Sequence, residues 1–296
     1  MPIQFNRRPR DAMRPAGFFK TFAIAPLAGW LLLFVLIPNA LVLAASFLRR
    51  DESGFVELSL TLGNYRRLLD PVYLRVFAHS LVLACAATVL CLVLAYPFAY
   101  WLARLRSGLR PLLLTLVVVP FWTNSLVRVY AIRALLAAKG LMNNTLLVLG
   151  LIDEPIRLLY TPAAVLIGMV YVLLPFMILP LYNSIEKLDR RLVEAAADLG
   201  AGPWRRFIEV ILPLTLPGII SGSLLVFMPA LGLFFITDVL GGSRDLLLGN
   251  FLKDQFLDAR DWPFGAAASM ALIGLLGLFL AAYAFSLKRF SPGGEA

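Results

Sequence analysis

The sequence is poor in the side chains from which catalytic and metal-binding sites are built. Its 296 residues include one histidine, His79, and two cysteines, Cys85 and Cys91. Six positions apart on a helix, the cysteines would be separated by about 9 Å along the axis and lie on different faces, which excludes a disulfide and a shared metal site. No Gly-Lys pair is present to form a Walker A loop. The sequence therefore predicts no catalytic residue, metal or cofactor in this chain.

Charged residues are also scarce. Only 15% of the residues are charged and 60% are hydrophobic, and the mean hydropathy is +0.82. A chain this apolar is predicted to be an all-α polytopic membrane protein rather than a soluble domain. The net charge of +9 comes from basic residues clustered in short segments beside apolar runs. This clustering indicates membrane topology and not nucleic-acid binding.

Six apolar runs are long enough to cross a bilayer, which takes about 20 residues in a helix. The first run has 26 residues, too many for the apolar region of a cleavable signal peptide, so we expect it to be retained. The predicted organisation is an N-terminal segment (1–21), a six-helix domain (22–287) and a C-terminal tail (288–296). The runs occupy residues 22–47, 77–102, 111–136, 163–182, 211–237 and 264–287.

The distribution of lysine and arginine predicts the orientation. One side of the membrane has 15 basic residues and the other has 12, where the first side comprises residues 1–21, 103–110, 183–212 and 288–296. The difference is small, but the short connection at 103–110 contains Arg104, Arg106 and Arg110 without an acid. Both termini and the connection between runs four and five are therefore predicted to be cytoplasmic.

Three outer connections follow, at 48–76, about 137–162 and 238–263. The second is rich in leucine and could lie as an interfacial helix. The third has an excess of acids, which suits a cationic solute or a basic partner surface. Paired charges in a solvated loop would give the same composition. The acids are Asp238, Asp245, Asp254, Asp258 and Asp261.

The apolar runs contain almost no ionisable side chains, which argues against a proton relay of buried carboxylates. They do contain aromatic and amide groups, and aromatic faces attract organic cations. Packing and interfacial anchoring are the alternative roles of these groups. Asp238 is the best single candidate to meet an incoming ammonium, and its alternative role is capping or pairing with Arg244. The candidate pathway residues are Asp238, Trp122, Asn124, Tyr171, Phe176, Phe227 and Phe234.

The segment 183–213 is neither a membrane run nor an ordinary loop. Its apolar spacing predicts one helix from about Glu186 to Leu199, which Gly200 ends, and Pro203 then begins a second helix. Two short helices would meet at an angle and present a carboxylate, small side chains and two aromatic rings to a groove in a partner. The alternative is an amphipathic helix lying on lipid. The residues that would dock are Glu194, Ala195, Ala196, Trp204 and Phe207.

This segment resembles the EAA loop of the permeases of ABC importers. The pattern is Glu-Ala-Ala, three residues, Gly, nine residues, Ile, one residue and Leu-Pro, and here Val210 stands in the place of Ile. The resemblance implies that the loop transmits motion from a cytoplasmic ATPase. It assigns coupling roles to Glu194 and Gly200.

A wider resemblance, over about residues 20–290, is to permeases of the spermidine/putrescine type. It rests on four segments, which are 64–71, 119–125, 174–176 and 260–265. It implies a type I importer fold in the bacterial inner membrane, with lipid around it, a second permease, two ATPase subunits and a periplasmic binding protein as partners. An importer of another small solute, an autonomous channel or secondary carrier, and a membrane-embedded enzyme are the rival interpretations, and the last two leave the EAA pattern unexplained.

Overall fold

The computed structural model describes residues 16–51, 56–106, 108–242 and 247–290, with side chains from residue 24 to residue 285. Most of the predicted N-terminal segment, the end of the predicted tail, and Arg244 and Asp245 lie outside the described residues. The first apolar run forms one long helical stretch made of α1 (Ala16–Leu31), the π-type turns of η1 (Leu32–Leu36) and α2 (Ile37–Ser46). From Ile24 on, most of its large apolar side chains are exposed, as expected for a surface that faces lipid.

Within the described part of the chain, five helical stretches are long and apolar enough to cross a membrane. A sixth results if one bent pair of helices counts as a single span. The fold is helical as predicted, with one small hairpin in addition. The stretches are Ile24–Ser46, α4 (Pro71–Arg104), α8 (Pro162–Glu186), Pro203–Gly232, which ends in α11 (Leu212–Gly232), and Trp262–Phe285, which lies within α14 (Trp262–Phe290).

The third predicted span, residues 111–136, is not one straight helix in the structure. The chain forms α5 (Arg110–Val118) and a 3-10 turn, η2 (Val119–Trp122), and then turns by 95° into α6 (Ser125–Leu136) and α7 (Leu141–Val148). Pro120 removes a backbone donor at the turn, and Asn124 restarts the helix because its Oδ1 accepts a hydrogen bond from Leu126 N at 2.8 Å. The apolar pattern continues across the break, so hydropathy alone does not reveal it.

The fifth predicted span also breaks before its expected end. α11 ends at Gly232, and Leu233, with φ −77° and ψ 61°, separates it from α12 (Phe234–Leu240). Asp238 therefore lies on a short separate helix. Its orientation differs from the one that an unbroken span would give it.

The three connections that are predicted to lie outside contain more structure than the sequence predicts. The first holds an antiparallel hairpin, β1 (Leu48–Arg50) and β2 (Val56–Leu60), followed by α3 (Gly63–Leu68). The second holds α7, which agrees with the expected helix, and the third holds α13 (Leu248–Leu257). The hairpin is held to the third connection by a hydrogen bond from Arg50 Nη2 to the carbonyl oxygen of Ala259, at 2.9 Å.

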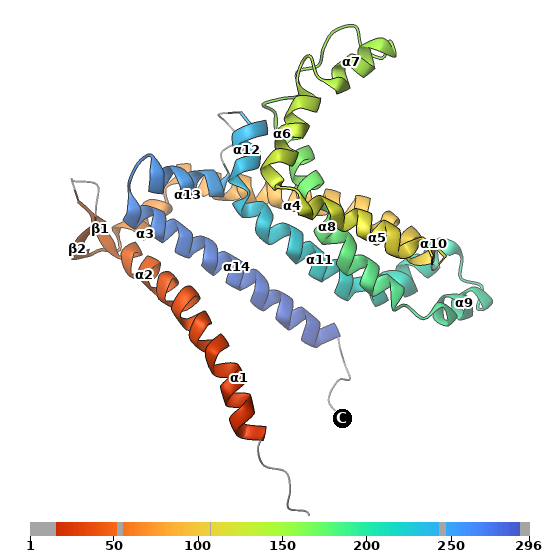
Figure 1. Ribbon diagram of the computed structural model, residues 1–296, viewed down its shortest axis with the longest axis horizontal. Coiled ribbons are helices and arrows are strands. Elements are labelled where there is room, and N and C mark those ends of the chain that lie inside the picture. The colour runs from red at the N-terminus through yellow and green to blue at the C-terminus, as the bar shows by residue number, and fades with distance from the viewer. Residues whose placement is uncertain (1–15, 52–55, 107, 243–246, 291–296) are drawn as a thin grey trace, which may run out of the picture.

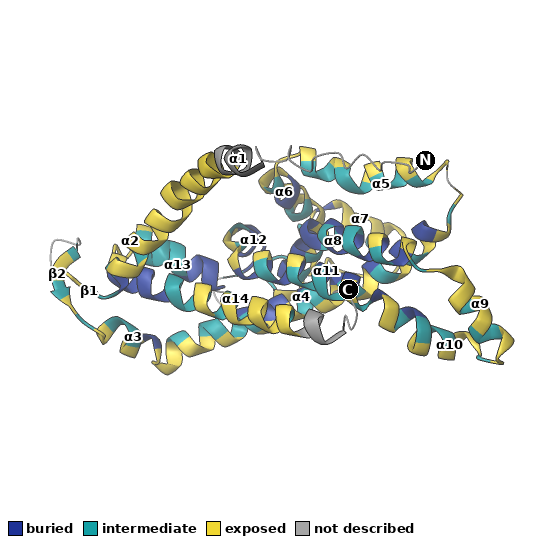
Figure 2. Ribbon diagram, turned by 90° about the horizontal axis from the view of Figure 1, so that it is seen from below, coloured by how far each residue is buried: buried dark blue, intermediate teal, exposed yellow. Residues whose placement is uncertain are grey.

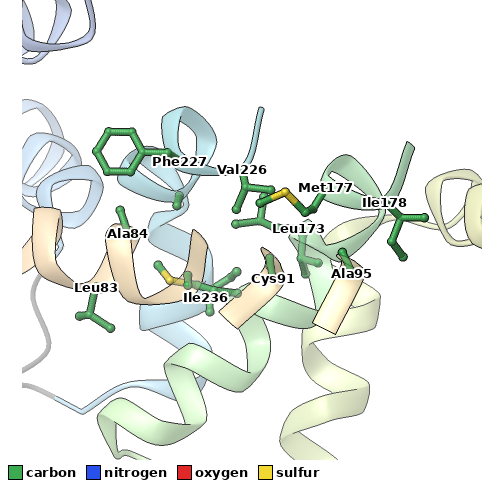
Figure 3. Close-up of a cluster of buried hydrophobic side chains, with 14 of the residues drawn as sticks. Leu83, Ala84, Cys91, Ala95, Leu173, Met177, Ile178, Val226, Phe227 and Ile236 are labelled. Atoms are coloured by element: carbon green, nitrogen blue, oxygen red, sulfur yellow. The ribbon is translucent and has the colours of Figure 1, made fainter. Parts of the chain in front are cut away.

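The core lies where α4, α8 and α11 cross, and small residues let these helices approach closely. α4 presents a stripe of fully buried alanines and Cys91, among them Ala84, Ala87, Ala95 and Ala99. On α11, a Cβ at Gly218 would lie 2.4 Å from Ser184 Cβ, and one at Gly222 would lie 2.8 Å from Met177 Sδ. Small residues spaced by four are a common means of packing membrane helices. Figure 3 shows side chains of α4, α8, α11 and α12 meeting in this core.

The buried core occupies the middle of the molecule, and the two ends of the long helices carry different structures. In Figure 1 the short helices α9 (Arg190–Asp198) and α10 (Pro203–Arg206) project at one end, and the hairpin, α3 and α13 lie at the other. The α6–α7 arm extends away from the bundle. Figure 2 shows buried residues on α4, α8 and α11 and also on α12, α13 and the start of α14, while α9 and α10 are mostly exposed.

Candidate functional site

The projecting corner is built by two short helices, and the first begins later than predicted. α8 runs to Glu186, and α9 then starts at Arg190 after a separate N-cap, in which Asp189 Oδ1 accepts a hydrogen bond from Arg191 N at 3.0 Å. Aspartate is a favoured N-cap because its carboxylate satisfies a free backbone donor. The predicted single helix from Glu186 to Leu199 is therefore the end of a span, a turn and a helix of nine residues.

Gly200 ends α9 in the left-handed conformation that the sequence predicts, with φ +82°. The N–H of Gly200 donates to the carbonyl of Ala197 at 2.9 Å, and the N–H of Ala201 donates to that of Ala196 at 2.9 Å. This pair of hydrogen bonds is a Schellman motif, which satisfies carbonyl groups at the helix end. Because the left-handed region is costly for residues with a Cβ, glycine sets the angle of the corner.

The second helix starts at Pro203, with Gly202 as its N-cap, as predicted. It continues without a break through the π-type turns of η3 (Phe207–Ile211) into α11. The corner presents apolar side chains to solvent, because Leu199 is 89% exposed and Trp204 72%. Of the predicted coupling residues, Glu194 and Ala195 are also exposed, and Ala196 is half-buried.

Phe207 connects the corner to the bundle. Its ring meets the Tyr96 ring of α4 edge to face with centroids 5.5 Å apart, and it stacks on Trp204 with centroids 5.8 Å apart. Tyr96 is fixed in turn by a hydrogen bond of 3.0 Å between its hydroxyl and Thr215 Oγ1 on α11. A displacement of the exposed Trp204 would therefore press on two of the three core helices.

A second candidate site lies around Asp238 on α12. The carboxylate accepts hydrogen bonds from Asn250 Nδ2 at 2.5 Å and from Lys253 Nζ at 2.8 Å, both on α13. Asn250 is buried and also binds the carbonyl of Phe234 at 3.1 Å and the hydroxyl of Thr237. The buried amide thus holds one oxygen of Asp238 rigidly, while Lys253 neutralises its charge.

The pair Asp238–Lys253 is partly exposed, with 39% and 29% of the two side chains accessible. The hydrogen bond to Asp238 raises the pKa of Lys253 above the usual value of a lysine. Lys253 therefore stays charged at neutral pH, and its contribution to the pair is lost as the pH rises through this elevated pKa. The ammonium of Lys253 also lies 5.8 Å from the centre of the Phe234 ring, at cation–π distance.

Of the other predicted pathway residues, Phe234 lies beside the Asp238–Lys253 pair and the rest lie elsewhere. Trp122, 79% exposed, and Asn124 lie at the turn after α5, and Phe176 packs nearby against Phe121 with ring centroids 4.8 Å apart. Tyr171 is exposed on α8. Phe227 is buried in the core and packs against Phe279 of α14 with ring centroids 4.9 Å apart.

Two charged residues that the sequence places in or near the predicted outer connections are buried in the structure. Arg128 on α6 is only 8% exposed, and its Nε and Nη1 have no hydrogen-bond partner among the described residues. Asp261, 2% exposed, caps α14 through Phe264 N and binds Arg67 Nη1 at 2.6 Å. Both residues lie close to predicted helix ends. Charged side chains at such positions are expected to be solvated.

Comparison with known proteins identifies the class. Residues 93–292 match the family model of the binding-protein-dependent transport system inner membrane component, and the chain belongs to this family. It is an integral inner-membrane permease of an ABC importer. The chain is 55% identical to the spermidine/putrescine transport system permease protein PotB of Salmonella typhimurium, over 92% of this chain and 94% of that protein.

Further relatives agree with this assignment. PotB of Escherichia coli K12 is 56% identical over 88% of this chain and 94% of its own length. The fold is that of a chain in the crystal structure of a bacterial alginate ABC transporter in complex with a periplasmic protein bound to an alginate pentasaccharide. That likeness has a TM-score of 0.75 at 15% identity, and it covers 95% of this chain and 97% of the other.

Proposed function

We propose that this chain is one of two permease subunits that form the translocation pathway for polyamines in an ATP-driven importer. A periplasmic binding protein delivers the solute, and a pair of ATPase subunits on the cytoplasmic side supplies the energy. Both termini and the corner formed by α9 and α10 face the cytoplasm. The observation that carries this proposal is the identity of more than half of the residues to permeases named for spermidine and putrescine, along nearly the whole chain.

The geometry of the corner supports a role in coupling to the ATPase. A docking surface needs a rigid backbone and exposed apolar anchors. The Schellman motif at Gly200 supplies the first, and the exposed Leu199 and Trp204 supply the second. Glu194 on α9 adds a carboxylate, which forms no ion pair with another described residue.

One helical stretch connects the corner to the site around Asp238, which is the outer site of this proposal. The helical stretch from Pro203 to Gly232 has 30 residues, which corresponds to a rod of about 45 Å. α12 follows this rod after one residue and carries Asp238. Closure of the ATPase subunits would move the corner, tilt the rod and displace α12 relative to α13. Displacement of α12 would separate Asp238 from Lys253.

This separation suits a cationic solute. In the structure the carboxylate of Asp238 already binds one primary ammonium, that of Lys253, beside the face of Phe234. A polyamine carries the same chemical group, so it can replace Lys253 without leaving the carboxylate unpaired. A solute that is neutral or anionic gains nothing from this exchange, which favours polyamines over other small solutes.

The proposal is tested by uptake into proteoliposomes that contain the complete transporter. We expect uptake of radiolabelled spermidine or putrescine that requires ATP and the binding protein, and unlabelled polyamines should compete while an amino acid should not. Uptake with which polyamines do not compete would refute polyamines as the substrate, but it would not refute the assignment as an importer. Solute flux through this chain alone, without ATP, would refute the importer and favour a channel.

A further inference from the structure

An arginine-rich pocket lies between the corner and the ends of the membrane helices. It has a volume of about 520 Å³, and its walls come from the end of α4, the start of α5, the end of α8, and the helices α9 and α10. Four arginines line it against two glutamates. The charged residues of this arginine pocket are Arg104, Arg110, Arg190, Arg206, Glu186 and Glu194.

Only one of the four arginines is neutralised by a neighbour in the described part of the chain. Arg110 Nη1 lies 3.1 Å from Glu186 Oε1, and the same guanidinium donates to the carbonyl of Leu105 at 2.9 and 3.2 Å. Arg104 stacks on the ring of Tyr100 at 4.1 Å and donates to its hydroxyl, which carries no charge. The pocket therefore keeps an excess of positive charge.

Arg206 is the arginine of the pocket that most clearly lacks a partner. Its Nε is enclosed and has no hydrogen-bond partner among the described residues. An enclosed guanidinium donor without an acceptor is costly, and the cost is removed when an anion enters. The adjacent Arg205 differs in each respect, since it is exposed and pairs with Glu209 at 2.9 Å, and it does not line the pocket.

The position of the pocket favours a phosphate carried by lipid. Arg104 is the last residue of α4, Arg110 the first of α5 and Glu186 the last of α8, so the pocket lies at the depth where membrane helices leave the bilayer. Trp101, 51% exposed and one turn before Arg104, is of the residue type that anchors helices at this interface. One guanidinium group can donate two parallel hydrogen bonds to two oxygens of a phosphate.

We propose that the arginine pocket binds a phosphate group, that of an anionic phospholipid headgroup. The lipid would sit between the helix ends and the corner. Its occupancy would then affect how firmly α9 and α10 are held against the bundle.

The test is a lipid titration on the full-length chain in neutral detergent, followed by native mass spectrometry. Short-chain phosphatidylglycerol and phosphatidylcholine are the probes, and inorganic phosphate is the competitor. We expect phosphatidylglycerol to bind about tenfold more tightly than phosphatidylcholine, and Arg206→Gln to remove most of that preference, because a charged hydrogen bond is lost. Arg205→Gln, which removes the same charge one residue away, should leave the preference unchanged.

Arg104→Gln is the second variant, in case Arg206→Gln lowers the amount of folded protein, and it should weaken the preference similarly. Equal binding of the two lipids, or equal losses in Arg205→Gln and Arg206→Gln, would overturn the proposal. Millimolar phosphate that displaces phosphatidylglycerol would support a shared phosphate site. Phosphate binding without any preference for the anionic lipid would assign the pocket to a free anion and overturn the lipid assignment.

Discussion

Gly200 offers the sharpest test of the coupling corner. A Cβ added at this residue would meet nothing within 4 Å, so substitution causes no clash. The whole effect comes from the backbone, because φ is +82° and a left-handed conformation costs a residue with a Cβ about 1–2 kcal/mol. If the ATPase binds only the corner with this angle, Gly200→Ala should reduce productive docking by a factor of about 5–30.

A graded series strengthens the test. Asparagine tolerates the left-handed region better than alanine, and valine tolerates it worse, so activity should fall in the order Gly, Asn, Ala and Val. The assay is ATP-dependent polyamine uptake by the reconstituted transporter, together with the amount of ATPase that stays bound to the membrane subunits during purification. Both quantities should fall in the same order.

The α6–α7 arm contains a matched control. Gly150 closes α7 with the same pair of hydrogen bonds and φ +66°, and a Cβ there would also meet nothing within 4 Å. Gly150→Ala imposes the same local strain far from the corner, so uptake should stay within about twofold of wild type. Equal losses in Gly150→Ala and Gly200→Ala would refute the reasoning, and so would wild-type uptake by Gly200→Val.

Three further outcomes follow from contacts in the structure. Asp238→Asn should lower the apparent affinity for polyamines about tenfold because the carboxylate is lost, whereas Lys253→Met should not lower it; equal losses in both variants would contradict cation exchange at this site. Asp261→Ala should lower the free energy of unfolding by about 2 kcal/mol, since it removes a helix cap and half of an ion pair; a melting temperature equal to that of wild type would contradict this. Gly218→Ala should destabilise the helix packing by about 1–3 kcal/mol, while Gly274→Ala, where a Cβ has free space, should not; detergent melting curves compare the two.

The corner was predictable because its signals are local in the sequence. Gly200 permits the left-handed conformation at a helix end and Pro203 fixes its own φ near the helical value, and the structure has both as expected. The start of the first helix was not predictable to the residue, because the apolar spacing continues from α8 through the turn. Only the cap at Asp189 marks the new start, and the weight of a single cap is small beside that of a continuing pattern.

The outer site was predictable in its carboxylate but not in its partners. Asp238 stands out because it follows a long uncharged stretch. Its partner Lys253 is 15 residues away on another helix, and the contact depends on the break at Leu233, which turns α12 toward α13. Leucine at a break carries no sequence signal. Pairing with the nearer Arg244, the expectation from the sequence, falls outside the described residues.

One bend accounts for most of the remaining differences in the pathway. If the third span were straight, Trp122 would be a mid-helix residue in lipid and Arg128 would lie near the outer surface. The turn of 95° at Thr123 and Asn124 instead leaves Trp122 exposed at the corner of the bend and brings α6 against α8 and α12. Arg128 is thereby buried without a hydrogen-bond partner for two of its nitrogens among the described residues. A charge enclosed in this way must gain an acceptor from outside the described residues or weaken the fold. The bend, which the hydropathy pattern does not reveal, therefore buries an arginine whose hydrogen bonds the described residues do not complete.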